Sequence, residues 1–424
     1  MSPPVPLTLY LLTLNCALLP QPPTHLSAAI TPTLPTLPPA LLLLSLQELA
    51  PISASFVGGP RLTQPITALS SAVSAATRSV YGAEAEFELL GWCHVGPTAL
   101  LAFTPTHSAA AVADVRWAST GLGVGLSVGG AGVGLGNKGA VAVRLLVDGV
   151  EITAVAVHFA AHEGAADRRD RDWADMVRTL VFSSSSSDGD GQGDGEEEEG
   201  EQEDVQQIYP TTANGHLFVF GDLNYRTSDV RPKGIVGLGV EVPPPNTPRS
   251  AWRSWLDRDQ LTARRRAGLT CHGLEEAPVT FPPTYKYDLD APASDDEGGE
   301  GREDVFVQNR WPSWTDRVLF LPSPRLEVMA YDSIPSYKGS DHQPVFAVFS
   351  IQGGVGEGGG EVVSPPFGVD ENWRLRRAVA RRGELVVGAA MVAAESAGVC
   401  GVLIGVVLVL WGGWWALGGA GAEM

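Results

Sequence analysis

The chain has 424 residues, of which 44% are hydrophobic and 18% are charged. This length is about two to three times that of a typical domain, which excludes a minimal module, and the composition is too apolar for a disordered chain. The formal net charge is −19, but sixteen of those charges lie in the two short stretches 188–204 and 290–304. The rest of the chain is therefore close to neutral, and its basic side chains remain available for an anionic ligand.

The first apolar run, residues 7–14, predicts a buried strand. The alternative is a secretory signal peptide. The first basic residue of the chain is Arg61, so the positively charged start of a signal peptide is missing. Four cysteines without close spacing indicate neither a zinc module nor a disulfide framework, which favours a reducing compartment.

Strand and helix patterns alternate along the remaining chain. A turn at Asp148-Gly149 joins two alternating runs into a predicted hairpin. We expect strands at 41–46, 140–146, 151–159, 217–220, 318–321 and 345–349, and helices at 67–78, 165–180 and 248–267. This order predicts an α+β fold in which two packed mixed sheets are flanked by helices, with a doubly wound parallel sheet as the weaker alternative.

Low-complexity segments divide the chain. We expect a catalytic domain over residues 1–351 that carries disordered acidic insertions at 183–204 and 290–304. Residues 352–384 are predicted to be a Gly/Pro-rich and basic linker.

The C-terminal residues 385–424 are predicted to contain a transmembrane helix. No residue between Glu395 and Glu423 is charged, and about 20 apolar residues suffice to cross a bilayer. Arginines precede this segment, so we expect a tail-anchored protein with its catalytic domain in the cytosol, on the endoplasmic reticulum or another endomembrane. The alternative is a helix buried against the catalytic domain.

The segment 134–139 (GLGNKG) fits the G-x-G-x-x-G dinucleotide pattern. That pattern must open a helix, whereas here the chain continues into the predicted hairpin. We expect instead a glycine loop whose backbone N–H groups and Lys138 suit a phosphate.

Polar side chains that suit metal and phosphate chemistry recur where predicted strands begin or end. They are Asn15, Glu48, His158, Asp222 and Asn224, and Asp341 and His342. Any one of them could be a turn or cap residue. Their recurrence at five strand ends favours a metal-assisted phosphoester hydrolase, in which oxygen ligands hold Mg²⁺ beside the substrate phosphate.

Seven blocks carry a resemblance to a known family. They are residues 45–48 (SLQE), 136–139 (GNKG), 157–162 (VHFAAH), 220–226 (FGDLNYR), 282–288 (PPTYKYD), 310–317 (RWPSWTDR) and 340–344 (SDHQP). In order, they resemble the catalytic domain of the inositol polyphosphate 5-phosphatases, within the endonuclease/exonuclease/phosphatase superfamily, over about residues 7–350. Thr315 stands where the family usually has cysteine, and Gln308 where it commonly has lysine.

The resemblance implies a role for each matching residue. Asn15 and Glu48 would bind Mg²⁺, with Asp341 supporting the metal. Asp222 would activate the attacking water, Asn224 and His158 would stabilise charge on the phosphoryl group, and Asp316 would orient His342 on the scissile phosphate. The substrate-binding residues would be Asn137, Lys138, His162, Tyr285, Lys286, Arg310, Arg317 and Lys338.

The resulting expectation is a Mg²⁺-dependent phosphatase that removes the 5-phosphate from phosphoinositide lipids at a cytosol-facing membrane, and the sequence leaves open whether soluble inositol polyphosphates are substrates. Two alternatives stay open. One is a nuclease of the same superfamily, which would need basic surfaces that track a nucleic acid. The other is a non-catalytic, membrane-anchored phosphoinositide-binding protein. We expect no nucleic-acid partner, and the sequence leaves the oligomeric state open.

Overall fold

A computed structural model describes residues 6–106, 110–128, 131–183, 205–232, 247–291, 305–352 and 362–397. Most of the two acidic insertions, the glycine run 353–360 and the apolar tail 398–424 lie outside the described residues, as do the predictions made for them.

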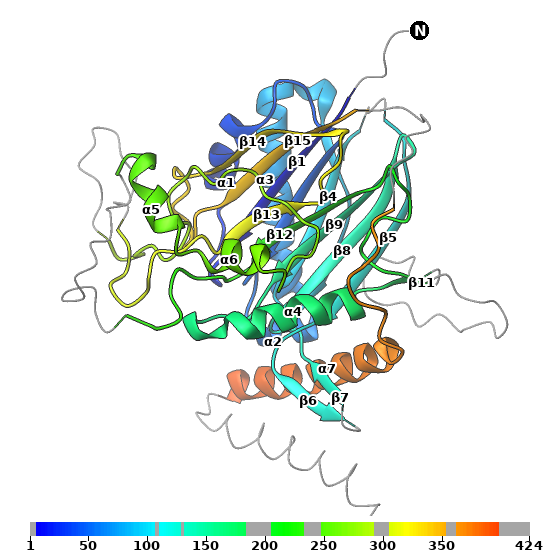
Figure 1. Ribbon diagram of the computed structural model, residues 1–424, viewed down its shortest axis with the longest axis vertical. Coiled ribbons are helices and arrows are strands. Elements are labelled where there is room, and N and C mark those ends of the chain that lie inside the picture. Colours follow the sequence, from blue (N-terminus) through cyan, green and yellow to red (C-terminus); the bar gives the residue numbers. More distant parts are fainter. Residues whose placement is uncertain are drawn as a thin grey trace, which may run out of the picture.

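Two mixed β-sheets packed face to face form the centre of the molecule (Figure 1). The six-stranded sheet has the order β14 (Leu326–Ser333), β15 (Val345–Ile351), β1 (Leu7–Asn15), β2 (Leu41–Gln47), β4 (Thr98–Pro105) and β3 (Phe87–Val95). The five-stranded sheet has the order β13 (Asp316–Phe320), β12 (His216–Asp222), β9 (Val150–His158), β8 (Gly139–Val147) and β5 (Val112–Gly121). Two small sheets pair β6 (Gly125–Val128) with β7 (Ala131–Gly134) and β10 (Phe182–Ser183) with β11 (Val205–Gln206). The predicted two-sheet architecture is confirmed.

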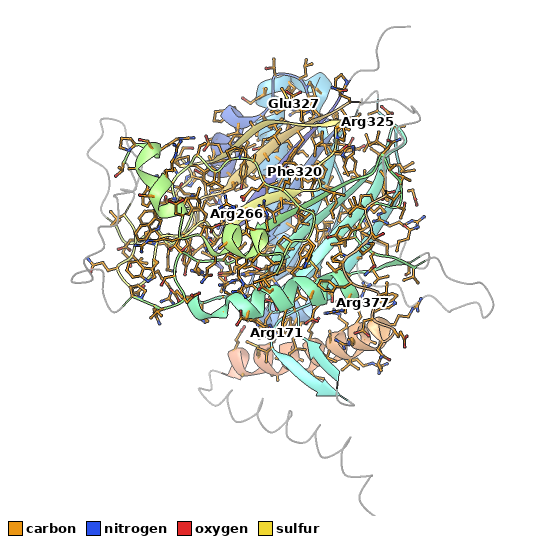
Figure 2. All side chains as sticks on the ribbon, viewed as in Figure 1. Arg171, Arg266, Phe320, Arg325, Glu327 and Arg377 are labelled. Carbon is orange, nitrogen blue, oxygen red and sulfur yellow. The ribbon has the colours of Figure 1, made fainter. Side chains whose placement is uncertain are left out.

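The leucine-rich run at the start of the chain becomes β1, a central strand that is buried on both faces. Leu9 and Leu11 point into the core between the two sheets, whereas Tyr10 and Leu12 point into the core beneath the outer helices. A strand with two buried faces reads as a continuous apolar run rather than an alternating one. Side chains fill the space between the sheets, and Phe320 in Figure 2 belongs to this inner core.

Helices cover the outer faces of the sheets (Figure 1). The α-helices are α1 (Pro23–Ile30), α2 (Ile52–Val57), α3 (Pro60–Tyr81), α4 (Ala166–Thr179), α5 (Arg253–Leu256), α6 (Gln260–Arg266) and α7 (Trp373–Ala397). Short 3₁₀ turns lie at Thr31–Thr33, Ala83–Ala85, Glu163–Ala165 and Arg249–Trp252. The helix expected over 248–267 is broken, because Asp259 caps α6 by accepting a hydrogen bond from the Thr262 N–H at 2.9 Å.

The expected tail-anchored localisation is corrected by α7. Within the residues that the structure describes, which end at Ala397, no helix is long and apolar enough to cross a membrane. The boundary expected at residue 384 falls inside α7, and this helix is amphipathic and packs beside α2 and the β6–β7 hairpin (Figure 1). Polar side chains attach α7 to α2: Arg381 donates to the Phe56 carbonyl at 2.8 Å, and Glu395 accepts from the Ser53 hydroxyl at 2.7 Å.

Candidate active site

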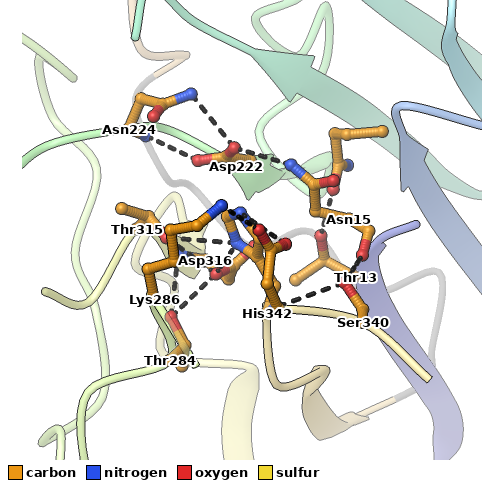
Figure 3. Close-up of polar contacts among 12 residues, drawn as sticks. Thr13, Asn15, Asp222, Asn224, Thr284, Lys286, Thr315, Asp316, Ser340 and His342 are labelled. Carbon is orange, nitrogen blue, oxygen red and sulfur yellow. Dashed lines mark hydrogen bonds and ion pairs between the residues drawn. The ribbon is translucent and has the colours of Figure 1, made fainter. Parts of the chain in front are cut away.

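The polar residues predicted at strand ends meet at one edge of the two packed sheets (Figure 3). Parallel pairing of β9 with β12 places His158 opposite Asp222, and antiparallel pairing of β12 with β13 places Asp316 on the other side of Asp222. In the other sheet, β1 ends at Asn15 and β2 ends one residue before Glu48. The two sheets therefore bring residues from distant parts of the sequence into one buried cluster.

Asp222 lies at the centre of this cluster and is about 1% exposed. Its carboxylate accepts hydrogen bonds from the Asn15 amide at 2.9 Å and from the Asn224 backbone and side-chain N–H groups at 3.0 Å each. The His158 Nε2 atom lies 3.3 Å away. Burial alone would raise the pKa of Asp222, but His158, His342 and Lys138 outweigh it and lower that pKa below its usual range. Asp222 is therefore ionised at neutral pH.

His342 and Asp316 form a second buried pair. The His342 Nδ1–H group donates to Asp316 Oδ2 at 2.9 Å, and the hydroxyls of Thr284 and Thr315 donate to the same oxygen at 2.7 and 2.8 Å. Burial opposes a charged imidazole, but the Asp316 and Asp222 carboxylates outweigh it and raise the pKa of His342 to about 10. His342 is thus an imidazolium whose Nδ1 is fixed by Asp316.

Lys138 approaches the same cluster from the glycine loop that precedes β8. Its Nζ atom contacts the Nε2 atom of His158 and lies 3.8 Å from the Glu48 carboxylate. Burial lowers the pKa of Lys138, although the carboxylates of Asp222 and Glu48 act against this effect. Burial and the neighbouring Lys138 likewise lower the pKa of His158. His158 is therefore the neutral imidazole of the site, in contrast to His342.

Tyr285 and Lys286 close one side of the cluster. The Tyr285 ring lies 4.6 Å from the His342 ring, and Lys286 pairs with the Asp341 carboxylate (Figure 3). Burial would raise the pKa of the Tyr285 phenol, but the nearby Arg226 outweighs it and lowers that pKa. This side of the site therefore combines positive charge with aromatic surface.

The structure gives the remaining candidate substrate residues different surroundings. Asn137 accepts a hydrogen bond from the Val124 N–H at 2.9 Å, which ties it to the β6 turn. Arg310 lies 3.8 Å from Glu163. His162 is exposed just before α4, and Lys338 is half-buried between β14 and β15. The substrate roles of these four residues stay predictions.

The structure does not bring Arg317, a predicted substrate-binding residue, to the central cluster. Its side chain has no exposed surface and forms ion pairs with Asp259 at 3.0 Å and Glu276 at 2.6 Å. These two carboxylates take up the guanidinium N–H groups. Because β13 turns this side chain away from the sheet edge and into a buried ion-pair network, Arg317 stabilises the fold instead.

Sequence analysis missed Arg226, which the structure places in the site. Its guanidinium donates to the Asn224 backbone carbonyl at 3.0 Å and contacts the Asn224 side-chain oxygen. It lies 4.2 Å from the Tyr285 ring centroid. Its Nη1 atom is buried and finds no acceptor in the described part of the chain. The alternation of polar residues at 222, 224 and 226 was the signal that could have identified it.

The oxygen atoms at this edge fit a hard divalent cation. One ligand atom each from Asp222, Asp316 and His342 lies within 4.8 Å of the others. Asp316 Oδ1 is buried without a hydrogen-bond donor among the described residues. Carboxylate and amide oxygens are the ligands that Mg²⁺ and Ca²⁺ prefer. His342 and Asp316 already bond to each other, so the side lined by Asn15 and Glu48 is the better place for a cation.

Comparison with known proteins identifies the family. The family model described as endonuclease/exonuclease/phosphatase family 2 matches residues 12–348, which is most of the chain. The chain belongs to this family. The match ends before α7 begins at Trp373, so that helix lies outside the region that defines the family.

Among known proteins, the chain is similar to inositol phosphate 5-phosphatases. The chain is 30% identical over 255 residues to the type II inositol 1,4,5-trisphosphate 5-phosphatase of Mus musculus, covering 59% of this chain and 21% of the relative. It is 31% identical over 249 residues to the type II inositol polyphosphate 5-phosphatase 15 of Arabidopsis thaliana, covering 53% and 21%. The chain thus spans about a fifth of the length of these relatives.

A solved structure shares the fold. The inositol polyphosphate 5-phosphatase domain of SPSynaptojanin, in complex with inositol (1,4)-bisphosphate and calcium ion, matches with a TM-score of 0.59 and 21% identity. The match covers 92% of this chain and 93% of that one. At this identity the comparison establishes the fold, and the chemistry has to be argued from the site.

Proposed function

We propose that this chain is a Mg²⁺-dependent phosphatase that removes the 5-phosphate from inositol polyphosphates and from phosphoinositide lipid headgroups. The observation that carries the proposal is the buried cluster in which an ionised Asp222 faces a charged His342. The names of the relatives support the choice of substrate class.

The charge states of the two central residues define a division of labour. Asp222 is a carboxylate at neutral pH, so it can orient a water molecule and accept its proton. His342 is an imidazolium, so it can donate to a phosphoryl oxygen while Asp316 fixes its ring. Lys138, beside His158, adds a further cationic donor, and the Asn224 amide fixes the Asp222 carboxylate by donating to it and to the Phe159 carbonyl. This arrangement favours attack by water over a covalent intermediate.

A bound Mg²⁺ would be held by Asn15 and Glu48, and it would supply charge neutralisation to the phosphate oxygens. Asn15 Oδ1 accepts one hydrogen bond, from the Ala17 N–H at 3.0 Å, which leaves it a second lone pair. Asp341 is already paired with Lys286, so its contribution would be to hold that lysine.

Phosphates elsewhere on the inositol ring need separate cationic contacts. Lys286 and Arg226 flank the Tyr285 ring, at 5.6 and 4.2 Å from its centroid. Arginine suits a phosphate particularly well because its planar group can donate two parallel hydrogen bonds. We assign the ring phosphates to this side of the site, with Arg310 as a further contact.

Metal removal gives the first test. Full-length protein is incubated with inositol 1,4,5-trisphosphate, with phosphatidylinositol 4,5-bisphosphate in vesicles, and with bis(p-nitrophenyl) phosphate as a diester. We expect phosphate release from the two inositol substrates with Mg²⁺, a loss of at least about 100-fold with chelator, and recovery when Mg²⁺ is restored. Equal rates with chelator would contradict the metal role, and preference for the diester would favour a nuclease.

A second prediction concerns Arg226. Replacement by lysine keeps a positive charge but removes the planar guanidinium group, which bonds to Asn224 and lies over the Tyr285 ring. We expect Arg226→Lys to lower kcat/KM by about 10- to 100-fold. Arg171→Lys, on the exposed surface of α4 (Figure 2), is the matched control and should leave the rate unchanged. Equal kcat/KM values for both variants would show that Arg226 contributes to neither substrate binding nor catalysis.

A further inference from the structure

The helix α7 packs against two parts of the chain that lie next to active-site residues, namely the glycine loop that carries Lys138 and the helix α2 that follows Glu48. One contact of α7 reaches the glycine loop: Glu384 Oε1 accepts a hydrogen bond from the Gly136 N–H at 2.8 Å. Gly136 stands two residues before Lys138. Other contacts of the same helix reach α2, which begins four residues after Glu48. The loops that carry Lys138 and Glu48 both approach the active site. They lie within the family match, whereas α7 lies outside it.

The Glu384 contact is built into the packing rather than lying on the surface. Its side chain is 6% exposed, and its only recorded cationic neighbour within ion-pair range is Arg381 at 3.7 Å, among the described residues. Burial raises the pKa of Glu384, while the Gly136 N–H and Arg381 act against this effect. A buried carboxylate is costly unless it is hydrogen-bonded, so the partner N–H group has a structural purpose.

The backbone around Gly136 has little room to move. A Cβ atom at Gly136 would lie 2.8 Å from the Glu384 carboxylate and 2.9 Å from a Val95 methyl group. The loop is also tied to its neighbours by the Leu122 N–H, which donates to the Lys138 carbonyl at 2.8 Å. Backbone hydrogen bonds with Gly123 and Val124 fix the loop at Leu135, and Glu384 adds a polar contact at Gly136 from the side of α7.

The helix α7 also packs closely against α2. A Cβ atom at Gly388, one turn after Glu384, would lie 2.7 Å from Phe56 and 2.9 Å from Val57. Glycine allows α7 to approach α2 directly, and Arg381 then donates to the Phe56 carbonyl at the end of α2. The position of Glu384 is thus set by packing that does not itself involve the glycine loop.

We propose that Glu384 is a positioning residue for the active site: through Gly136 it holds the glycine loop so that the Lys138 ammonium reaches His158 and Glu48. The proposal rests on the proposed function for its effect on catalysis, but the loop contact stands independently. It places a determinant of activity on a helix outside the family match. Loss of α7 would therefore impair the enzyme although every predicted catalytic residue remained.

Three variants of the full chain test the proposal. Glu384→Ala removes the acceptor, Glu384→Gln keeps a side-chain oxygen that can accept from the Gly136 N–H, and Glu395→Ala removes a polar contact of the same helix with Ser53 and Arg61. We expect Glu384→Ala to lower kcat for inositol 1,4,5-trisphosphate by about 10- to 100-fold. Glu384→Gln should recover most of that loss, and Glu395→Ala should match the unmodified chain.

Backbone hydrogen exchange supplies a readout that does not depend on activity. In Glu384→Ala, amides of residues 134–139 should exchange faster while those of β9 keep their protection. Unchanged loop exchange in Glu384→Ala, or a Glu384→Gln variant as impaired as Glu384→Ala, would overturn the proposal. If the unmodified chain releases no phosphate, the proposed function fails, and loop exchange alone then decides the role of Glu384.

Discussion

We expect Asp222→Asn to lower the turnover of inositol 1,4,5-trisphosphate by about 10²- to 10⁴-fold, the range for losing a general base. The substitution preserves the size of the side chain but removes the negative charge that three N–H donors and two histidines surround. The loss should appear in kcat more than in KM, because the role proposed for Asp222 is to activate the attacking water rather than to bind the ring phosphates. Steady-state phosphate release measures both constants.

The matched control for this variant is Asp257→Asn. Asp257 is exposed and lies after α5, outside the site. Both variants should unfold cooperatively in thermal denaturation, so that the difference in turnover reflects chemistry. If kcat of the Asp222→Asn variant were nearly the same as that of the unmodified enzyme, the proposed catalytic role of Asp222 would be contradicted.

Arg317→Met should cause the largest loss of stability, about 3 to 5 kcal/mol in the free energy of unfolding. The reason is that Asp259, at 0% side-chain exposure, would lose its cation, and Glu276, at 5%, would keep only the longer pairing with Arg265 at 3.4 Å. Asp259 also caps α6, so the disturbance would extend to that helix. Urea denaturation monitored by tryptophan fluorescence measures the change.

Arg78→Met is the appropriate comparison for Arg317→Met. Arg78 pairs with Glu86 at 3.3 Å, but both side chains are more than half exposed, so this pair should contribute less than about 1 kcal/mol. If Arg317→Met instead left stability unchanged and raised KM, the result would support substrate binding by Arg317 and contradict a structural role for its ion pairs.

Most of the buried strands were predictable because their apolar runs leave few alternatives, although β4, which is buried along its whole length, was not predicted. The residues 7–14, 41–46 and 217–220 all became central strands, and the polar residues that follow them met at one edge because neighbouring parallel strands end together. The edge strands β3 and β5 were missed. They mix exposed and buried positions without regular alternation, and β-bulges interrupt both at their pairing with β4 and β8.

Long-range packing explains what the sequence could not show. Arg317 and Arg226 are both arginines beside predicted site residues, yet one pairs with two buried carboxylates and the other lies over Tyr285. The partners of Arg317 come from elsewhere in the chain, so local pattern gives no hint of them. Likewise, the arginines of α7 (such as Arg377 in Figure 2) resembled a basic linker because the contacts of α7 are with α2 and Gly136, more than 200 positions away.

The identity of the product tests directly whether this protein removes the 5-phosphate. Full-length protein with Mg²⁺ is given inositol 1,4,5-trisphosphate, and the bisphosphate formed is identified by ion-exchange chromatography against standards. We expect inositol 1,4-bisphosphate together with one equivalent of phosphate, and formation of the same product about 10²- to 10⁴-fold more slowly by the Asp222→Asn variant. Formation of a different bisphosphate isomer, or no phosphate release from the unmodified protein, would contradict the proposed function.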